Sequence, residues 1–334
     1  MKSIKDIFSQ LGRILETFGS DPISRSIMDM AMRDNEWFTE ADIRYAVDAV
    51  RREMLDEKRV EKWLSLYPSL SKRSGEKKRV AVIMAGNIPL VGLFDVLCVV
   101  ASGNIPCVKP SSKDSVLYTF VEQLLLNIEP SLKIEQYTPD GEYDAVIATG
   151  GDSANLYFRT AFEGVPSLLR GSRHSVAVLS GGENDGDMKA LAEDMFLHSG
   201  LGCRNVSLVF VPKGYKLTLT APKMCRAYHN NCLQCRALLT MQGEQFDDLG
   251  EAVVVNRSSA EFPRFLSQVN VVECTDLESV KAWLKVNDEA LQCVVSGIDG
   301  LHSRCVPFGC AQHPTLFDYA DERDTMQFLS TIGV

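Results

Sequence analysis

The stretch that decides the fold is Val80-Ala-Val-Ile-Met84-Ala-Gly-Asn-Ile-Pro89, which is followed by an apolar run from Leu90 to Ala101. Five consecutive apolar residues before a Gly-Asn-Ile-Pro turn are typical of a strand buried on both faces of a parallel sheet. The run that follows is apolar almost all round, which predicts a buried helix, and Gly103 predicts its C-terminal cap. Strand, turn and helix in this order predict the first part of an α/β sheet.

The alternation continues downstream of this part. We expect helices over 115–126 and 153–162, and strands over 106–109, 133–137, 144–148 and 175–179. Strands and helices that alternate over about a hundred residues predict a doubly wound sheet, which is a common nucleotide-binding architecture. The sequence contains no Gly-x-Gly-x-x-Gly here, so the usual dinucleotide fingerprint is absent.

Further regions flank this sheet. Apolar residues at helical spacing predict a helical region over residues 1–75, and the sheet is expected over 76–182. A second series of strand and helix patterns predicts a second α/β domain over 183–303. The remaining residues, 304–334, combine turns with one short helix.

Composition narrows the class of protein. A formal net charge of −9 argues against nucleic acid as a partner, since phosphate backbones need a basic surface. No signal peptide and no apolar run of membrane-spanning length is visible, so we expect a cytoplasmic protein without a membrane span. The ten cysteines are then expected to be reduced.

One cysteine lies in a loop between two expected elements. In Phe196-Leu-His-Ser-Gly-Leu-Gly-Cys203-Arg-Asn-Val-Ser-Leu-Val-Phe210, a helix over 187–199 precedes the cysteine and a strand over 206–211 follows it. Glycines at 200 and 202 allow a tight turn, and a thiol on such a loop can form an acyl-enzyme because its thiolate is a strong nucleophile. The alternative is a buried cysteine of purely structural role.

The densest cysteine cluster is Cys225-x3-His229-x2-Cys232-x2-Cys235. Its spacing puts Cys225, His229 and Cys232 on one face of a helix, which leaves zinc as an alternative. The stretch lacks the glycine-rich knuckles of a zinc ribbon or finger. We therefore predict a half-buried helix and no metal site.

Several motifs occur in a characteristic order. They are Gly86-Asn87-Ile-Pro89, Cys107-Val-Lys109-Pro-Ser111-Ser112, Ala148-Thr149-Gly150-Gly151, Gly202-Cys203 and Pro307-Phe308-Gly309. Together they resemble the Trp-Asn-Phe-Pro, Lys-Pro-Ser/Ala-Glu, Phe-Thr-Gly-Ser, catalytic-cysteine and Pro-Phe-Gly motifs of the aldehyde dehydrogenase superfamily. The segment Asn35-Glu-Trp-Phe-Thr39 resembles its acyl-CoA reductase branch, which includes the fatty acid reductase of bacterial luminescence systems.

The resemblance implies a fold and a reaction. Residues 76–182 would bind the nucleotide, residues 183–303 would carry the catalytic cysteine, and residues 304–334 would return to the nucleotide-binding domain. Cys203 would attack an acyl thioester, and Asn87 would donate to the oxyanion together with the Cys203 N–H. Reduction of the acyl-cysteine would yield a fatty aldehyde, from acyl-CoA or from an acyl-carrier protein. An acyl transferase or synthetase, or a second copy of the chain, would be the partner.

The resemblance also implies a cofactor site made of Lys109, Ser111, Ser112, Thr149, Gly150 and Gly151. Ser112 stands where the superfamily has its ribose-binding glutamate, and Lys113 follows it. A carboxylate there would repel a 2′-phosphate, whereas a hydroxyl and an ammonium can bind one. This difference favours NADPH over NADH.

The sequence departs from the superfamily at two places. The Glu-Ile-Phe-Gly-Pro motif that holds the nicotinamide ribose has no match near 265–269, and the general-base glutamate would fall near Leu169. Two alternatives therefore stay open. One is an acylating aldehyde dehydrogenase that works mainly in the oxidative direction, and the other is a cofactor-free acyl-transfer or scaffolding subunit.

Overall fold

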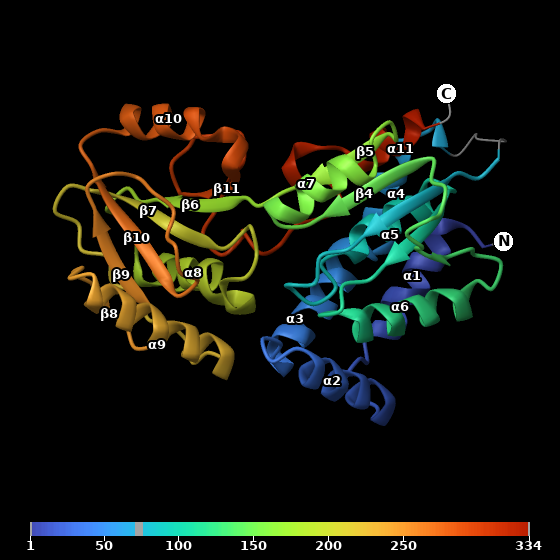
Figure 1. Cartoon of the computed structure of the whole chain (residues 1–334), viewed down its shortest axis with the longest axis horizontal. Coiled ribbons are helices and arrows are strands. Elements are labelled where there is room, and N and C mark those ends of the chain that lie inside the picture. The colour runs from blue at the N-terminus through green and yellow to red at the C-terminus, as the bar shows by residue number, and fades with distance from the viewer. Residues whose placement is uncertain (1, 71–75, 333–334) are drawn as a thin grey trace. The chain divides into compact units, whose positions relative to one another are not determined.

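The computed structural model describes residues 2–70 and 76–332, and the chain divides into two compact units. The first unit consists of Met1–Ser172 and Pro314–Val334, and the second of Arg173–His313. Figure 1 labels the elements of both units. No helix of the described residues has the length and apolar character that crossing a membrane requires.

The first unit begins with the expected helical region, as far as residue 70; residues 71–75 of that region lie outside the described part. Four α-helices form it: α1 (Ile4–Leu15), α2 (Pro22–Asp34), α3 (Glu40–Ala49) and α4 (Glu57–Ser65). Each begins directly after a side chain that accepts a backbone N–H of the first turn, in order Ser3, Asp21, Thr39 and Asp56. These caps satisfy N–H groups that the helix itself leaves without partners.

The sheet of the first unit has five parallel strands in the order β3-β2-β1-β4-β5. The strands are β1 (Arg79–Ile83), β2 (Ile105–Lys109), β3 (Glu135–Gln136), β4 (Ala145–Thr149) and β5 (Ser167–Arg170). Helices α5 (Leu93–Ala101), α6 (Ser115–Ile128) and α7 (Asp152–Ala161) connect them, and Gly103 follows α5 with the positive φ of a C-terminal cap. The sheet confirms the doubly wound architecture.

Alternate residues of β1 enter two different cores. Val80 and Val82 pack with the N-terminal helices, α5 and α6, whereas Ala81 and Ile83 pack with Phe158 of α7. Helix α11 (Thr325–Thr331) joins the first of these cores, so the chain returns to the first unit from Pro314 onward, whereas residues 304–313 of the expected C-terminal segment belong to the second unit. Burial on both faces explains why β1 reads as an uninterrupted apolar run.

The second unit is built on a sheet of seven strands in the order β12-β11-β6-β7-β10-β9-β8, in which only β8 runs antiparallel to its neighbour. The strands are β6 (His174–Val178), β7 (Val206–Pro212), β8 (Asp247–Asp248), β9 (Val253–Arg257), β10 (Gln268–Cys274), β11 (Leu291–Val295) and β12 (Cys305–Val306). Helix α10 (Leu277–Val286) lies on one side of this sheet, and α8 (Asp185–Phe196) and α9 (Arg226–Met241) lie on the other (Figure 1).

One strand lies in a different sheet from the one expected. The strand predicted over 175–179 is β6, and it pairs with β7 and β11 in the second sheet. The edge position in the first sheet belongs instead to β5, a short strand that the sequence did not reveal. A run of alternating strand and helix patterns predicts buried parallel strands, but it does not show at which strand one sheet ends and the next begins.

Candidate functional site

The Cys203 thiol is exposed on a turn between α8 and the amino end of β7. Helix α8 stops at Phe196, earlier than the expected Ser199, and the chain then turns through His198, Ser199 and Gly200 at φ of 53°, 56° and 66°. Left-handed backbone at two residues with a Cβ costs about 1 kcal/mol or more for each. Surrounding contacts therefore have to stabilise this turn.

The side chain of Asn205 supplies several of these contacts. Its Oδ1 accepts the Gly202 N–H at 2.8 Å, and its own backbone N–H donates to the Gly202 carbonyl at 3.1 Å. Its Nδ2 donates to the carbonyls of Asp194, Met195 and Leu197 at 3.0–3.1 Å, at the end of α8. One buried amide thus joins the end of the helix to the turn that carries Cys203.

Ser175 of β6 contacts the other side of the same turn. Its Oγ donates to the Cys203 carbonyl at 2.9 Å, accepts the Cys293 N–H at 3.2 Å, and lies 3.1 Å from the Cys293 Sγ. Burial raises the pKa of the Cys293 thiol. Cys293 is therefore a neutral buried neighbour, in contrast to the exposed Cys203.

The Pro307-Phe308-Gly309 turn is attached to α8 through Asp194. One carboxylate oxygen accepts the Gly309 N–H at 2.6 Å and the other accepts the Ala311 N–H at 2.9 Å. The residue is fully buried, and burial raises the pKa of Asp194 to about 6, against the two N–H contacts that lower it. Two motifs that are a hundred residues apart in the sequence, Gly202-Cys203 and Pro307–Gly309, are thus both tied to the end of α8.

In the first unit, the predicted residues gather at the carboxyl ends of adjacent strands. Asn87 follows β1, Lys109 ends β2 and Thr149 ends β4, and β1 is paired with both of the other strands. Strands β2 and β3 lie on one side of β1, and β4 and β5 lie on the other. The strand order therefore reverses at β1, and the carboxyl ends of β1 and β4 form the switch point of the sheet. Ligands of open α/β sheets bind at such a point.

The turn with Asn87 packs closely on the predicted ribose-binding segment. A Cβ at Gly86 would lie 2.4 Å from the Ser111 side chain, so only glycine fits there. Ser111 is half-buried, and its Oγ accepts the Lys113 N–H at 3.3 Å, while Ser112 and Lys109 are exposed. The structure therefore places Asn87 and the Ser111–Ser112 segment on neighbouring turns.

Gly150 and Gly151 begin the connection to α7. The Gly150 N–H donates to the Arg170 carbonyl at 3.1 Å, and a Cβ at Gly150 would be 2.9 Å from that of Ala154. At Gly151, which precedes the first residue of α7, a Cβ would meet nothing closer than the Ser172 Oγ at 3.9 Å. The backbone at the start of α7 is therefore accessible to a ligand.

A residue that the sequence did not single out holds the Asn87 turn in place. Asp114 is 4% exposed, and its Oδ2 accepts the N–H of Leu90, which has a φ of 59°. The N···O distance is 2.7 Å, and Oδ1 is buried without a hydrogen-bond partner. Burial raises the pKa of Asp114 to about 7, with the Leu90 N–H opposing the shift.

The stretch expected near the general base is strand β5. Leu169 is partly buried against the core that contains Phe158, and the Arg170 guanidinium is buried. Arg170 donates to Asp95 at 2.6 Å and to Thr325 at 2.8 Å. The neighbouring carboxylate that these contacts reveal, Asp95 of α5, is thus buried and paired with Arg170.

The cysteine cluster lies on or next to α9. Cys225 caps the helix by accepting the Tyr228 N–H at 3.4 Å, His229 lies 3.2 Å from Glu251, and Cys232 and Cys235 are buried. Helix α9 begins at Arg226, directly after Cys225. Within residues 2–70 and 76–332, no three His, Cys, Asp or Glu side chains are grouped as metal ligands. That the protein binds no metal remains a prediction.

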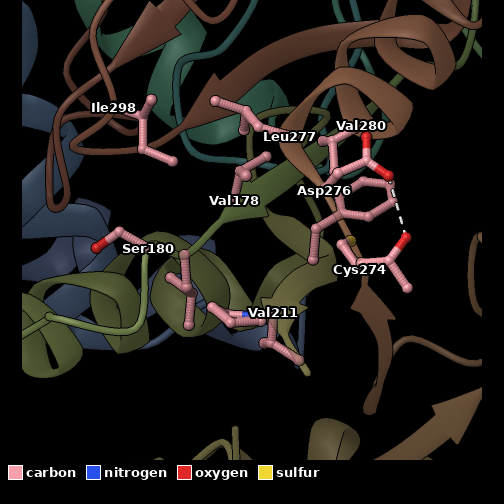
Figure 2. Close-up of a pocket in the computed structure, with 12 residues that line it drawn as sticks. Val178, Ser180, Val211, Cys274, Asp276, Leu277, Val280 and Ile298 are labelled. Carbon is pink, nitrogen blue, oxygen red and sulfur yellow. Dashed lines mark hydrogen bonds between the residues drawn. The ribbon is translucent and has the colours of Figure 1, made fainter. Parts of the chain in front are cut away.

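A pocket of about 280 Å³ lies at the carboxyl ends of the strands of the second sheet, whereas Cys203 lies at their amino ends. Figure 2 shows its lining at the carboxyl ends of β6, β7 and β10, with Val178, Val211 and Ile298 around it. Asp276, which caps α10, is the one acid among its lining residues. Because Cys203 precedes β7 and this pocket follows it, the pocket is not the site of the cysteine chemistry.

Comparison with known proteins identifies a family model. The model described as acyl-CoA reductase (LuxC) matches residues 25–227, which are 203 of the 334 residues. The matched range includes Asn87, the predicted cofactor residues and Cys203. No curated protein matches the sequence.

Solved structures similar to this chain include several aldehyde dehydrogenases and an oxidoreductase. Aldehyde dehydrogenase 21 from Physcomitrella patens, solved with the reaction product succinate, is 12% identical with a TM-score of 0.66, over 88% of this chain and 72% of that one. The oxidoreductase from Marinobacter aquaeolei is 12% identical with a TM-score of 0.66, over 94% and 79%. Aldehyde dehydrogenase C from Pseudomonas syringae, in complex with NAD+ and octanal, is 14% identical with a TM-score of 0.59, over 89% and 73%. These similarities confirm the predicted fold.

Proposed function

The chain belongs to the acyl-CoA reductase (LuxC) family, and from this premise we propose that it reduces a fatty acyl thioester to the aldehyde through an acyl-cysteine at Cys203. Membership of the family makes it an oxidoreductase that acts on an acyl or aldehyde group. The observation that carries the proposal is the exposed Cys203 thiol on a turn held by buried side chains, inside the matched range.

The first step is acyl transfer. The Cys203 thiolate attacks the carbonyl carbon of the thioester, a tetrahedral oxyanion forms, and the bond to the carrier sulfur breaks, so that the carrier leaves as a thiolate that takes up a proton. The proposed donors to the oxyanion are the Cys203 backbone N–H and the Asn87 amide. The close packing of Gly86 on Ser111 and the Asp114–Leu90 contact support Asn87, because they keep its turn in one conformation.

The second step needs a reduced nicotinamide cofactor, and the carboxyl edge of the first sheet fits one. The accessible backbone at Gly151 and the N-terminus of α7 suit a pyrophosphate, since helix N-termini attract anions. The exposed Lys109, Ser112 and Lys113 suit the adenosine ribose and a 2′-phosphate. When bound, the cofactor supplies the hydride for the acyl-cysteine. The absence of a carboxylate at Ser112 supports NADPH over NADH.

The acyl donor is proposed to be acyl-CoA or an acyl-carrier protein, and an acyl transferase or synthetase is the proposed partner. The functional division of the chain is also proposed, with nucleotide binding in the first unit and the catalytic cysteine in the second. The chain passes from the first compact unit to the second between Ser172 and Arg173, ten residues before the boundary expected from the sequence.

The test is a product assay with matched donors and cofactors. The protein is incubated with acyl-CoAs of several lengths, or with acyl-carrier protein, and with NADPH or NADH, and aldehyde is detected by mass spectrometry. We expect aldehyde, formed faster with NADPH. No aldehyde from any pairing would refute the function, and faster reaction with NADH would refute the cofactor preference.

A further inference from the structure

We propose that Asn205 and Ser175 are positioning residues that fix the peptide groups on both sides of Cys203 and so orient its backbone N–H for the oxyanion. The inference rests on the proposed function, in which Cys203 accepts the acyl group. Asn205 lies two residues after Cys203 and Ser175 begins the strand expected over 175–179, and the sequence alone indicated no role for either side chain.

The contacts hold two consecutive peptide planes. The Gly202 carbonyl and the Cys203 N–H belong to one planar trans peptide, and the structure has no cis peptide among the described residues. The backbone N–H of Asn205 donates to that carbonyl at 3.1 Å, so the direction of the Cys203 N–H is fixed as well. The next peptide is held by Ser175, whose Oγ donates to the Cys203 carbonyl at 2.9 Å.

The Asn205 side chain fixes the turn relative to α8. Its Oδ1 binds the Gly202 N–H, and its Nδ2 is shared among three carbonyls at the end of the helix. The left-handed residues His198 and Ser199 lie between these two attachment points. Without the amide, the carbonyls at the end of the helix would lose their hydrogen-bond donor and the strained turn could relax, which would move the Cys203 backbone.

Both side chains are poor candidates for any direct part in catalysis. Asn205 is 5% exposed and Ser175 is fully buried. The side-chain oxygen and nitrogen atoms of both residues form hydrogen bonds with backbone groups or lie against Cys293. Neither can reach a substrate in this conformation. Their effect on the reaction must therefore pass through the position of Cys203.

Two reactions of the Cys203 thiol distinguish a misplaced oxyanion donor from a general loss of structure. Acyl transfer forms an oxyanion, so its rate depends on an aligned N–H donor, whereas alkylation by iodoacetamide is a displacement at carbon that forms none. Exposed Cys310 provides an internal reference for alkylation. The quantity to measure is the rate of acylation of Cys203 divided by its rate of alkylation, with both products located by peptide mass spectrometry.

The variants are Ser175→Ala, Ser175→Thr and Asn205→Ala. We expect Ser175→Ala and Asn205→Ala to lower the ratio about 10- to 100-fold, as misalignment of one oxyanion donor should, and Ser175→Thr to keep most of it because its hydroxyl remains. Asn270→Ala is the matched control. Asn270 is also a buried amide of this sheet, and its Nδ2 donates to the Glu261 carbonyl at 2.8 Å, so its loss should lower stability without changing the ratio.

The outcomes distinguish this inference from the function on which it rests. A wild-type protein whose Cys203 is alkylated but not acylated would refute the proposed function. A wild-type protein that is acylated, with an unchanged ratio in both alanine variants, would refute the positioning role alone. If Asn205→Ala fails to fold, Ser175→Ala decides the question, since it removes a single hydroxyl. An equal fall of the ratio in Asn270→Ala would also contradict the inference, because it would show a general effect of instability.

Discussion

The replacement of Asp114 by asparagine should remove a pH dependence from the stability of the first unit. Burial raises the pKa of Asp114 from 3.8 to about 7 in the native protein, so between these values the folded chain binds a proton that the unfolded chain releases. Stability therefore falls as the pH rises through this window. The sign is opposite to that of an aspartate whose pKa is lowered by an ion pair.

The size of the effect follows from the two pKa values. Between pH 5 and pH 8, Asp114 should lower the free energy of unfolding by about 3 kcal/mol. The asparagine side chain of the variant cannot ionise, and its amide oxygen can still accept the Leu90 N–H that Asp114 accepts at 2.7 Å. Asp114→Asn should thus match the wild type near pH 5 and exceed it in stability at pH 8.

Urea unfolding at the two pH values is the assay. Trp37 and Trp63 lie in the first unit and Trp283 in the second, so a Trp283→Phe background makes tryptophan fluorescence report on the first unit. The control is Asp140→Asn, which removes an exposed carboxyl from the same unit. If wild type and Asp114→Asn lose the same stability from pH 5 to pH 8, the carboxyl does not titrate in this window and the reasoning is wrong.

Three further predictions concern the proposed chemistry. Cys203→Ala should abolish the covalent acyl adduct while leaving the circular dichroism spectrum unchanged; labelled acyl-CoA that still attaches to the variant would exclude Cys203. Asn87→Ala should lower kcat by roughly two orders of magnitude with less effect on cofactor affinity, the usual loss for one oxyanion donor, and an unchanged kcat in a chemistry-limited assay would leave Asn87 a structural turn residue. Ser112→Glu should weaken NADPH binding more than NADH binding in a fluorescence titration, because its carboxylate repels the 2′-phosphate; a constant ratio of the two affinities would place Ser112 away from the ribose.

Local sequence predicted the elements well where one physical requirement dominates. The apolar run Val80–Met84 has to be buried on both faces, and β1 is. The positive φ at Gly103 follows from the need to end a buried helix. Sheet membership was not predictable, since the strand at 174–178 has the same apolar character as those of the first sheet although it pairs with β7 and β11.

The polar residues that hold the candidate site were not predictable from their neighbours in sequence. Asp114 acts on a turn 24 residues away, Ser175 on a carbonyl 28 residues away, and Asp194 on a turn more than a hundred residues away. In the sequence, such side chains cannot be distinguished from ordinary surface or helix-capping residues, because only the folded chain brings their partners close. Gly200 indicated a tight turn, but the left-handed backbone of the two preceding residues, His198 and Ser199, was not predictable because neither is a glycine.

The chemistry of Leu169 bears on the fate of the acyl-enzyme. Hydrolysis of an acyl-cysteine needs a base to activate water, and Leu169 occupies β5 as an apolar side chain, partly buried against the core of Phe158. The next residue, Arg170, is paired with the buried carboxylate of Asp95. Water should therefore react slowly, and the adduct should wait for the hydride.

The most direct measurement follows the acyl group on the protein. The protein is mixed with labelled acyl-CoA in the absence of cofactor, the adduct is located by peptide mass spectrometry, and NADPH is then added. We predict one long-lived adduct on Cys203, little free fatty acid, and conversion of the adduct to aldehyde after NADPH is added. An adduct on another residue, or rapid release of free acid before any cofactor is present, would contradict the account.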